Sequence, residues 1–534
     1  MSEVVDAVVV GAGPNGLVAA NDLADRGWDV LVLEAEAQPG GAVRSDESLE
    51  PGFVTDLFSA FYPLGAVSPH FRRLELERWG LAWSQAPAVV AHPTPDGPTA
   101  LLSTDRAATA AALDAFAPGD GDAWLELQEL WDRIERPLVD ALMAPFPPVR
   151  AGGRLLWTLG RRHLADVARL ATLSVRRLGE EHFRGDGATL LVAGSALHAD
   201  ITPDTPTSAL FGWLLAAIGQ AHGWPVPRTG AGALTAALVA RLHDRGGALR
   251  CGERVVRISV TDGRATSVHT AGGATVHARR AVLADVVAPT LYGELLPPGT
   301  VRGRAADLHR TYQRGAATFK LNWTLDGPIP WRDPAVGRAG TVHLADSLDE
   351  LTITSAQLAA GWLPAHPFVL VGQMTTADPS RSPAGTESVW AYTNVPQDVR
   401  GDAGGDLPGV VEPAHAEQLA ARIEARIEAY APGFRDLVRR RSIQTPRDLE
   451  RADANLLGGD KSLGTAQLHQ QLVFRPTIGL GRAETPVAGL FLASASAHPG
   501  GGVHGACGAN AARAAVAADR RRRLVGRVGG GRRA

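Results

Sequence analysis

Cysteine is nearly absent from this sequence. Cys251 and Cys507 are the only two among 534 residues. Two thiols are too few for a disulfide framework or a cysteine-rich metal site. We therefore predict no metal centre and a reducing compartment.

Long apolar runs are missing too. The longest, residues 209–219, is shorter than the ~20 residues that a bilayer-spanning helix needs. The first residues, Met1 to Asp6, include two acids and do not form the positively charged start and apolar core of a signal peptide. We expect a cytoplasmic protein whose membrane contact is at most peripheral.

No charge of one sign dominates, because the formal net charge is only -3. A net charge this small creates too weak an electrostatic field to attract nucleic acid, and we predict no nucleic-acid partner. The segment Arg520 to Arg533 is locally basic and poor in apolar residues, which predicts a flexible tail over residues 520–534. Hydrophobic (45%) and charged (20%) fractions are those of a globular protein, and the length suggests two to four structural units.

The amino-terminal segment carries the clearest pattern. Val4 to Val10 is an apolar, β-branched run typical of a strand buried in a parallel sheet. Pro14 to Arg26 has helical spacing and is followed by Gly27, and Asp29 to Glu34 restores the strand pattern. Together these segments predict a βαβ unit.

A GxGxxG motif joins the first strand to the helix: Gly11, Ala12, Gly13, Pro14, Asn15 and Gly16. In such a loop the first glycine permits the tight turn, the second lets the backbone approach a pyrophosphate, and the third lets helix and strand pack closely. The helix amino-terminus offers free N–H groups to the phosphates. Glu34 lies where a carboxylate accepts hydrogen bonds from ribose hydroxyls. The motif predicts dinucleotide binding and is compatible with both NAD and FAD.

Two further glycine clusters accompany this motif. Gly40 and Gly41 follow Glu34 by a few residues, inside Pro39 to Ser45. Near the other end, Leu490 to Ser494 has the pattern of a buried strand, and it leads through His498 to Gly505 into an alanine-rich helix, Asn510 to Ala518. Paired glycines at these places would bring backbone close to a cofactor.

These motifs resemble the phytoene desaturase-like family of flavoproteins, within the wider amine oxidase and glutathione reductase-like FAD fold, in particular its branch called pyridine nucleotide-disulfide oxidoreductase domain-containing protein 2. The resemblance runs to about Ala518 and is strongest in six segments: Gly11 to Ser45, Pro51 to Phe53, Pro227 to Ile258, Asn455 to Asp460, Arg475-Pro476 and His498 to Asn510. It implies an α/β fold, with a Rossmann-like FAD-binding domain, a mixed-sheet substrate domain and a helical cap.

The resemblance also implies FAD as cofactor and a set of binding residues. The ADP half would lie on the first loop and Glu34, the loop of Gly40 to Arg44 would line the pyrophosphate or flavin, and the backbone of Val255 and Val256 would border the adenine. The C-terminal loop would close over the ribityl chain and the flavin ring. The full expected set is Gly11, Ala12, Gly13, Pro14, Asn15, Gly16, Glu34, Ala35, Gly40, Gly41, Ala42, Val43, Arg44, Val255, Val256, Ala284, Ser494, Gly501, Gly502 and Val503.

The sequence departs from the family pattern at Ser494 and Ala497, where Gly and Thr are common. This puts individual flavin hydrogen bonds in doubt, and leaves the fold unaffected.

The domain organisation follows from composition and from the resemblance. The FAD-binding domain would consist of residues 1–70, 225–300 and 446–519, with a β-meander at 254–282 whose turns are Asp262-Gly263 and Gly272-Gly273. Residues 71–224 form long helical segments broken at Pro137 and at Pro145 to Pro148, which suggests a cap. Residues 301–445 would form the substrate domain, with strands at 316–325 and 368–374, a surface loop at 401–409 and a helix at 417–430.

Three side chains are candidates for catalysis. Lys320 resembles the amine oxidase lysine that binds a water beside flavin N5, and an ordinary surface lysine is the alternative. His498 and His504 flank the three glycines and are either proton carriers or hydrogen-bond partners of the backbone. Cys507 lacks a CxxC partner and is interpreted as a packed thiol.

The aromatic stretch 209–224, with Phe211, Trp213 and Trp224, either lines an apolar substrate tunnel or packs in a core.

The leading expectation is an FAD-dependent dehydrogenase or desaturase. A small hydrophobic or polyene-like substrate would give hydride to flavin N5, with oxygen or a quinone as electron acceptor. An amine oxidase is the first alternative, although the segment Gly500 to Gly502 lacks the aromatic residue usual near its flavin. A flavin-dependent isomerase and a non-catalytic FAD-binding protein are the others. The sequence does not determine the oligomeric state.

Overall fold

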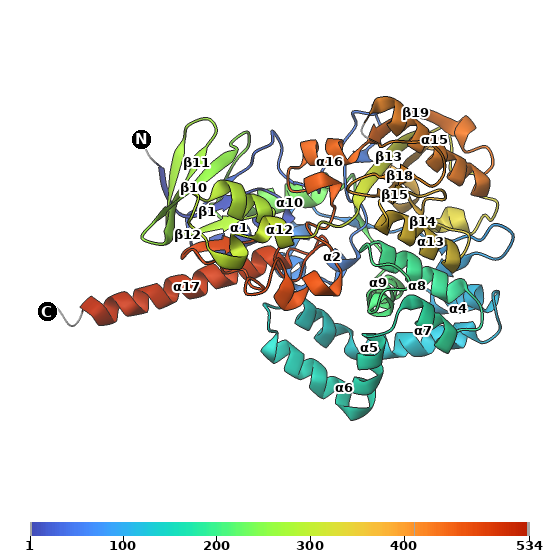
Figure 1. Cartoon of the computed structure of the whole chain (residues 1–534), viewed down its shortest axis with the longest axis horizontal. Helices are drawn as coiled ribbons and strands as arrows, with labels where there is room; N and C mark the ends of the chain where they lie inside the picture. Colours follow the sequence, from blue (N-terminus) through green and yellow to red (C-terminus); the bar gives the residue numbers. More distant parts are fainter. Residues whose placement is uncertain (1–2, 411, 531–534) are drawn as a thin grey trace.

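The computed structural model describes residues 3–410 and 412–530, and it contains two large sheets and a group of helices (Figure 1). The first sheet lies near the amino-terminus, the second lies beside it, and the helices gather below the second sheet in this view. Among the described residues, no helix is both long and apolar enough to span a membrane.

The first sheet has the strand order β10-β11-β12-β1-β2-β9, and β20 also pairs with β12. Its centre is parallel, through the pairs of β1 with β2 and β12, whereas β10, β11 and β12 form an antiparallel meander. The strands are β1 (Glu3–Val10), β2 (Val30–Leu33), β9 (Ala248–Arg250), β10 (Val255–Thr261), β11 (Arg264–Thr270), β12 (Thr275–Ala284) and β20 (Leu490–Leu492). Three distant parts of the chain therefore build one sheet.

Local chemistry explains these elements. The apolar run of β1 is buried from Val5 onward, as expected for a strand covered on both faces. The turn between β10 and β11 places Asp262 at φ 50° and Gly263 at φ 73°, the left-handed conformations that a two-residue hairpin turn needs. The predicted meander is thus present and joins the first sheet through β12.

Helices α1 (Pro14–Ala24), α10 (Gly232–Asp244) and α17 (Ala506–Gly530) pack with this sheet. α17 approaches α1 so closely that a Cβ on Gly508 would lie 1.8 Å from the carbonyl oxygen of Asn15. The glycine is therefore needed for the contact between the two helices.

The second sheet has the order β19-β13-β17-β16-β14-β6-β7. One face packs against α15 (Pro413–Tyr430), because Phe319, Leu321 and Trp323 of β13 share a core with Ile423 and Ile427. The other face carries the alternate residues of each strand. The strands are β6 (Ala88–His92), β7 (Ala100–Leu102), β13 (Ala317–Leu325), β14 (Ala339–Leu344), β16 (Val369–Gln373), β17 (Glu387–Val395) and β19 (Val438–Gln444).

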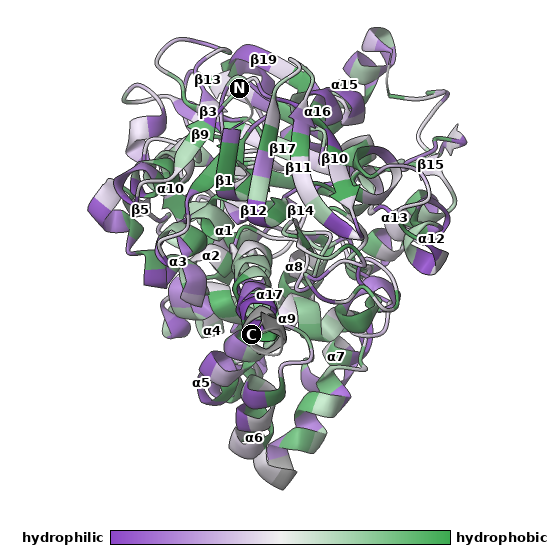
Figure 2. Ribbon diagram, turned by 90° about the vertical axis from the view of Figure 1, so that its left-hand side faces the viewer, coloured by the Kyte–Doolittle hydropathy of each residue, from purple (hydrophilic) through white to green (hydrophobic). Residues whose placement is uncertain are grey.

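The cap consists of six helices: α4 (Arg106–Asp114), α5 (Asp120–Met143), α6 (Val149–Leu170), α7 (Val175–His182), α8 (Gly187–Leu197) and α9 (Ser208–His222). α8 and α9 are its most apolar members, and α8 is buried along its whole length. α6 lies at the outer tip of the molecule (Figure 2).

The remaining β-strands and α-helices are mostly short. They are β3 (Ser45–Asp46), β4 (Thr55–Asp56), β5 (Trp83–Ser84), β8 (Val226–Pro227), β15 (Trp362–Leu363), β18 (Gly401–Asp402), α2 (Pro63–Val67), α3 (Pro69–Leu74), α11 (Ala288–Thr290), α12 (Leu308–Thr311), α13 (Leu348–Ala359), α14 (Met374–Ala377) and α16 (Pro446–Ala452). The predicted loop at 401–409 begins with the two residues of β18, which pair with β15.

Three expectations differ from the structure. Pro137 lies inside α5 and does not end it, since packing against neighbouring cap helices outweighs one lost backbone hydrogen bond. β6 and β7 fall within residues 71–224 but belong to the second sheet, because a short apolar run does not by itself reveal its partners. α17 continues to Gly530 through most of the predicted flexible tail, where Asp519 pairs with Arg522 and Arg523 along the helix. Residues 531–534 lie outside the described residues.

Candidate functional site

The two amino-terminal glycine loops lie against each other at the carboxyl edge of β1 and β2. The amide of Gly40 donates to the carbonyl of Ala12 at 2.9 Å. A Cβ on Gly41 would lie 3.2 Å from the Cα of Gly13. The residues predicted from two separate motifs therefore form one surface, made largely of backbone.

This surface fits a diphosphate. The N-cap residue of α1, Gly13, has no side chain to cap the helix, and among the first-turn amides of the described residues only that of Gly16 donates to a side chain, Asp285. This end of the helix can therefore still bind an anion. We call this surface, formed by residues 11–16 and 40–41, the cradle. A Cβ on Gly13 would lie 2.8 Å from Oδ2 of Asp285, so only glycine at this position leaves the cradle open. The residues from Gly11 to Gly16 thus have the geometry that FAD requires.

Glu34 lies directly behind the first loop. Its Oε2 accepts a hydrogen bond from the amide of Ala12 at 2.7 Å, and its Oε1 accepts one from the amide of Glu36 at 2.9 Å. These bonds hold the carboxylate of Glu34 and the backbone of Ala35 at the edge of the cradle, where a ribose would lie.

The start of β10 borders the same edge through its backbone. The amide of Glu253 donates to the carbonyl of Glu34 at 2.8 Å. Val255 is buried, whereas the side chain of Val256 is 47% exposed and points to solvent.

The loop of Gly40 to Arg44 is fixed by its own arginine. Arg44 donates from Nε to the carbonyl of Gly41 at 2.9 Å and from a terminal nitrogen to the carbonyl of Ala452 at 2.5 Å. Its guanidinium also lies over the ring of Phe58. Ala42 and Val43 follow within the same turn, where the carbonyl of Val43 accepts from the hydroxyl of Thr235.

Two carboxylates that the motifs did not reveal face this cradle. Asp285 follows Ala284, the last residue of β12, and its Oδ2 accepts a hydrogen bond from the amide of Gly16 at 2.8 Å. Burial raises the pKa of Asp285 to about 8, and Asp453 and Glu34 add like-charge repulsion. Burial also raises the pKa of Asp453 to about 6. A carboxyl group kept neutral beside a diphosphate avoids repulsion between anions.

The C-terminal glycine loop lies near α2, farther along the site. A Cβ on Gly502 would lie 2.7 Å from Leu64, and one on Gly65 would lie 3.2 Å from the carbonyl oxygen of Val503. Gly501 is equally close to Ser462. The loop therefore runs between two walls where side chains do not fit, as expected of a segment that closes over a flat ring.

Behind this loop, Ser494 is fully buried, and its hydroxyl accepts a hydrogen bond from the amide of Ser496. Ala497 is buried in the core of the first sheet. The two departures from the family pattern are thus accommodated by packing.

The two histidines of the loop are buried. Nδ1 of His504 accepts a hydrogen bond from the amide of Ala506 and so caps α17. His498 packs edge-on against Phe146, and neither of its ring nitrogens has a hydrogen-bond partner among the described residues. Burial lowers the pKa of each to about 4, so both are neutral at pH 7. His504 therefore bonds to the backbone, which is one of the two roles that the sequence left open.

Cys507 is a packed thiol. Its Sγ lies 3.5 Å from the carbonyl oxygen of Ala497 and is fully buried. Burial raises the pKa of Cys507 to about 12, so it is not a thiolate at neutral pH.

Lys320 is buried on β13 and is not a surface lysine. Its Nζ donates to the carbonyl of Asp56 at 2.7 Å, to Oδ1 of Asn322 and to Oε1 of Gln444 at 3.4 Å. Burial lowers the pKa of Lys320 to about 7, against the attraction of Asp56. The amine therefore changes charge near neutral pH.

Asp56 connects Lys320 to a buried ion-pair network. Its Oδ2 accepts from Arg381 at 2.7 Å, and Arg381 also pairs with Asp378 at 3.0 Å. Its Oδ1 accepts from the amide of Ala231 at 2.8 Å. The network joins β4, the start of α10 and the second sheet, and nothing local in the sequence indicates it.

Aromatic side chains lie on the same sheet face as Lys320. Tyr392 and Trp390 of β17 are the cross-strand neighbours of Lys320 and Asn322. Their rings stack, with centroids 5.9 Å apart, and Phe61 meets Trp390 edge-on. Phe61 lies three residues before Leu64, which faces the C-terminal glycine loop. The arrangement forms an apolar floor next to that loop.

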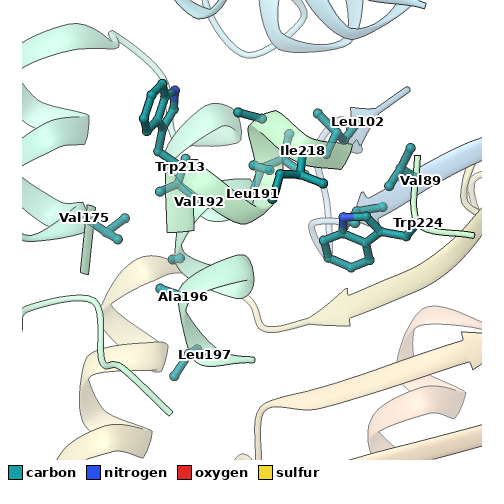
Figure 3. Close-up of a cluster of buried hydrophobic side chains, with 14 of the residues drawn as sticks. Val89, Leu102, Val175, Leu191, Val192, Ala196, Leu197, Trp213, Ile218 and Trp224 are labelled. Atoms are coloured by element: carbon teal, nitrogen blue, oxygen red, sulfur yellow. The ribbon is translucent and has the colours of Figure 1, made fainter. Parts of the chain in front are cut away.

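The stretch 209–224 serves mainly as core. Trp213 is buried inside the cap (Figure 3). Its ring meets that of Trp131 edge-on. Trp224 is buried at the other end of the same cluster, beside His198 and β6. Phe211 is partly exposed. Of the two predicted roles of this stretch, lining a substrate tunnel or packing in a core, Trp213 and Trp224 have the second.

Comparison with known proteins agrees with this geometry. Residues 15–394 match the family model for flavin containing amine oxidoreductases. The chain is 30% identical to pyridine nucleotide-disulfide oxidoreductase domain-containing protein 2 of Rattus norvegicus, over 95% of this chain and 92% of that one. It is 26% identical to the phytoene desaturase (lycopene-forming) of Pseudescherichia vulneris, over 93% and 96%.

A solved structure shares the fold. Cyclohexylamine oxidase from Brevibacterium oxydans superimposes with a TM-score of 0.57 at 16% identity, and the match covers 97% of this chain and 99% of that one.

Proposed function

Because this chain belongs to the flavin containing amine oxidoreductase family and has FAD as its cofactor, we propose that it is a dehydrogenase or desaturase of a small hydrophobic or polyene-like substrate. FAD held by the glycine loops would supply the redox chemistry, by taking up a hydride from the substrate. The observation that carries the proposal is the apolar floor around Lys320, next to the C-terminal glycine loop.

The floor suits an apolar chain. Trp390 and Tyr392 lie side by side on one strand, with Phe61 edge-on against Trp390. Removing apolar substrate surface from water contributes about 25 cal/mol per Å², so binding needs few hydrogen bonds. A buried floor also keeps water away from the reacting C–H bond.

Lys320 would provide the polar contact in this apolar setting. Asp56 and Asn322 orient Nζ, and the third N–H of the ammonium form, which has only the long 3.4 Å contact to Gln444, would be the one that polarises a water or a flavin oxygen. In this role Lys320 would favour the transfer of electrons from the reduced flavin to oxygen or a quinone.

The similarity to a phytoene desaturase supports a polyene-like substrate. The geometry of the aromatic pair argues against an amine substrate, because its two rings stack with each other at 21° and do not face across a gap.

Anaerobic mixing of the FAD-loaded protein with apolar polyenes and with primary amines tests the proposal. We expect a polyene to bleach the flavin absorbance, with oxygen or a quinone restoring it. Bleaching by amines alone would favour the oxidase, and product formed over an oxidised flavin would favour an isomerase. Bound FAD that no compound reduces would indicate a non-catalytic protein.

A further inference from the structure

A cleft of about 700 Å³ lies where the cap meets the first sheet's helices. α1, α3, the end of α5, the start of α6 and the first turns of α17 line it. None of its lining residues belongs to the glycine loops or to the apolar floor around Lys320. The cleft is therefore separate from the proposed redox site.

The cleft is strongly positive. Five arginines and two aspartates line it, a formal charge of +3, whereas the whole chain has -3. The arginines are Arg26, Arg73, Arg150, Arg154 and Arg513. Such a concentration of charge attracts anions.

Several donors in the cleft are free. Asp22 pairs with Arg73, and Asp140 pairs with Arg154 at 3.5 Å. Arg150 and Arg513 make no ion pair or hydrogen bond with any residue in the described part of the chain. Two guanidinium groups, one on α6 and one on α17, are thus available to a ligand.

A buried histidine points to the same conclusion. His70 is 7% exposed and lines the cleft, and its Nε2 has no hydrogen-bond partner in the part of the chain described. Burial lowers the pKa of His70 to about 3, so the ring is neutral at pH 7. An unpartnered buried polar atom costs about 1–3 kcal/mol, which a ligand oxygen accepting from Nε2 would recover.

The remaining lining is apolar. Met143, Pro147, Val149 and Ala509 contribute to the walls between the charged groups. A ligand that matches the whole cleft therefore has an anionic head and an apolar body.

We propose that this cleft binds a phosphomonoester attached to an apolar body. A phosphomonoester carries a charge of about -1.5 to -2 at pH 7, which matches the net charge of the cleft better than a single carboxylate does. A guanidinium group can donate two parallel hydrogen bonds to two oxygens of the same phosphate. The ligand bridges α6 of the cap and α17 of the FAD-binding unit.

The same chemistry has two sources, a soluble phosphate ester and the headgroup of phosphatidic acid in a membrane. The outer face of α6 distinguishes them. Leu156 is 56% exposed and Trp157 88% exposed, and both lie on α6, at the outer tip of the molecule (Figure 2). A lipid surface would bury these side chains, whereas a soluble ester in the cleft would not.

Octyl phosphate titrated into the FAD-loaded full chain by calorimetry tests the site. We expect saturable binding that salt weakens, and a loss of at least tenfold in affinity in the double variant Arg150→Ala/Arg513→Ala. Both arginines are unpaired, so the variant should keep its flavin spectrum. The exposed pair Arg302→Ala/Arg304→Ala, outside the cleft, is the matched control and should bind like wild type. Equal binding by all three proteins, or none by wild type, overturns the proposal.

Vesicle sedimentation identifies the source. If the ligand is the lipid, phosphatidic acid vesicles should capture the protein and phosphatidylcholine vesicles should not. This capture should be reduced in Trp157→Ala and unchanged in the control Trp362→Ala, whose side chain is also exposed. Octyl phosphate binding without vesicle capture assigns a soluble ester. Failure of both probes contradicts the site and leaves the proposed redox function untouched.

Discussion

Lys320 shows how burial changes the chemistry of a single residue. The chain has only two lysines, and this one lies on a strand where the amine is surrounded by acceptors and apolar rings. The strand was predictable from its apolar pattern. The partners were not, because Asp56 and Gln444 are more than 120 residues away in the sequence.

Replacing Lys320 with Met should slow flavin reoxidation and turnover by roughly tenfold or more. The ammonium form is the proposed active one, and the pKa of Lys320 is about 7. The wild-type rate should therefore fall as pH rises through about 7, and this inflection should be absent in Lys320→Met. Stopped-flow reoxidation between pH 6 and 9 measures both effects. Identical rates and pH profiles in the two proteins would exclude a role for Lys320.

Asp285 makes stability depend on pH. Its carboxyl group keeps the proton up to about pH 8 when folded, compared with 3.8 ordinarily. The folded state binds the extra proton between these values, so stability falls as pH rises from 4 to 8. Asp285→Asn retains an oxygen for the amide of Gly16 and removes the titration. At pH 8 and without FAD, the free energy of unfolding of the variant should exceed that of the wild type by ~1 kcal/mol or more, since one pKa unit equals about 1.4 kcal/mol.

Urea denaturation at pH 5 and pH 8 measures this difference. The control Asp262→Asn changes an exposed turn and should leave the pH dependence as in wild type. A variant Asp285→Asn that loses stability equally at both pH values would indicate that the carboxyl group is ionised in the folded protein.

Sequence reasoning found the residues that act through local backbone geometry. Gly13 and Glu34 belong to a motif whose spacing follows from one strand, one turn and one helix. Asp285 gave a weaker signal, the first polar residue after a buried strand of the parallel sheet, and it was missed. Arg381 gave no local signal, since its partner Asp56 is 325 residues away.

At the scale of elements, the first loop and α1 act as one unit. Gly13→Ala should lower FAD occupancy by at least tenfold, because the added Cβ would lie 2.8 Å from Oδ2 of Asp285 and narrow the cradle. Flavin absorbance per chain after purification in excess FAD measures occupancy. The control Gly153→Ala, on α6 where a Cβ meets nothing within 4 Å, should keep full occupancy. Equal occupancy in both variants would place the cofactor elsewhere.

The ion pairs of Arg381 connect β4 to the segment before β17. Arg381→Met should cost about 3–5 kcal/mol, because it leaves the buried carboxylates of Asp56 and Asp378 unpaired. Arg106→Met breaks an exposed pair with Asp132 and should cost less than about 1 kcal/mol. Urea denaturation of both compares them directly. Similar losses would mean that the buried network does not hold these elements together.

The strands and helices that the sequence placed one by one could be predicted from their own periodicity. β1, α1, β2, the meander, β13, β16, α15 and β20 lie where the sequence placed them. The errors concern tertiary context: α5 continues through Pro137, and β6 joins a sheet whose other strands come mostly from residues 317–444. No local pattern encodes such partnerships.

At the scale of the whole molecule, the C-terminal glycine loop follows β20 of the first sheet and lies against α2 and the segment that follows α5 of the cap. The first sheet carries the dinucleotide cradle, and the second carries the apolar floor with Lys320. The cap packs against the second sheet (Figure 1). The family and its cofactor were foreseeable from ordered motifs. The proposed substrate class depends on side chains that only the folded chain brings together.

The flavin content of the purified full chain tests the central claim most directly. We predict a yellow protein that releases one FAD per chain on denaturation, with occupancy lost in Gly13→Ala and kept in Gly153→Ala. A colourless protein that takes up no added FAD would contradict the account.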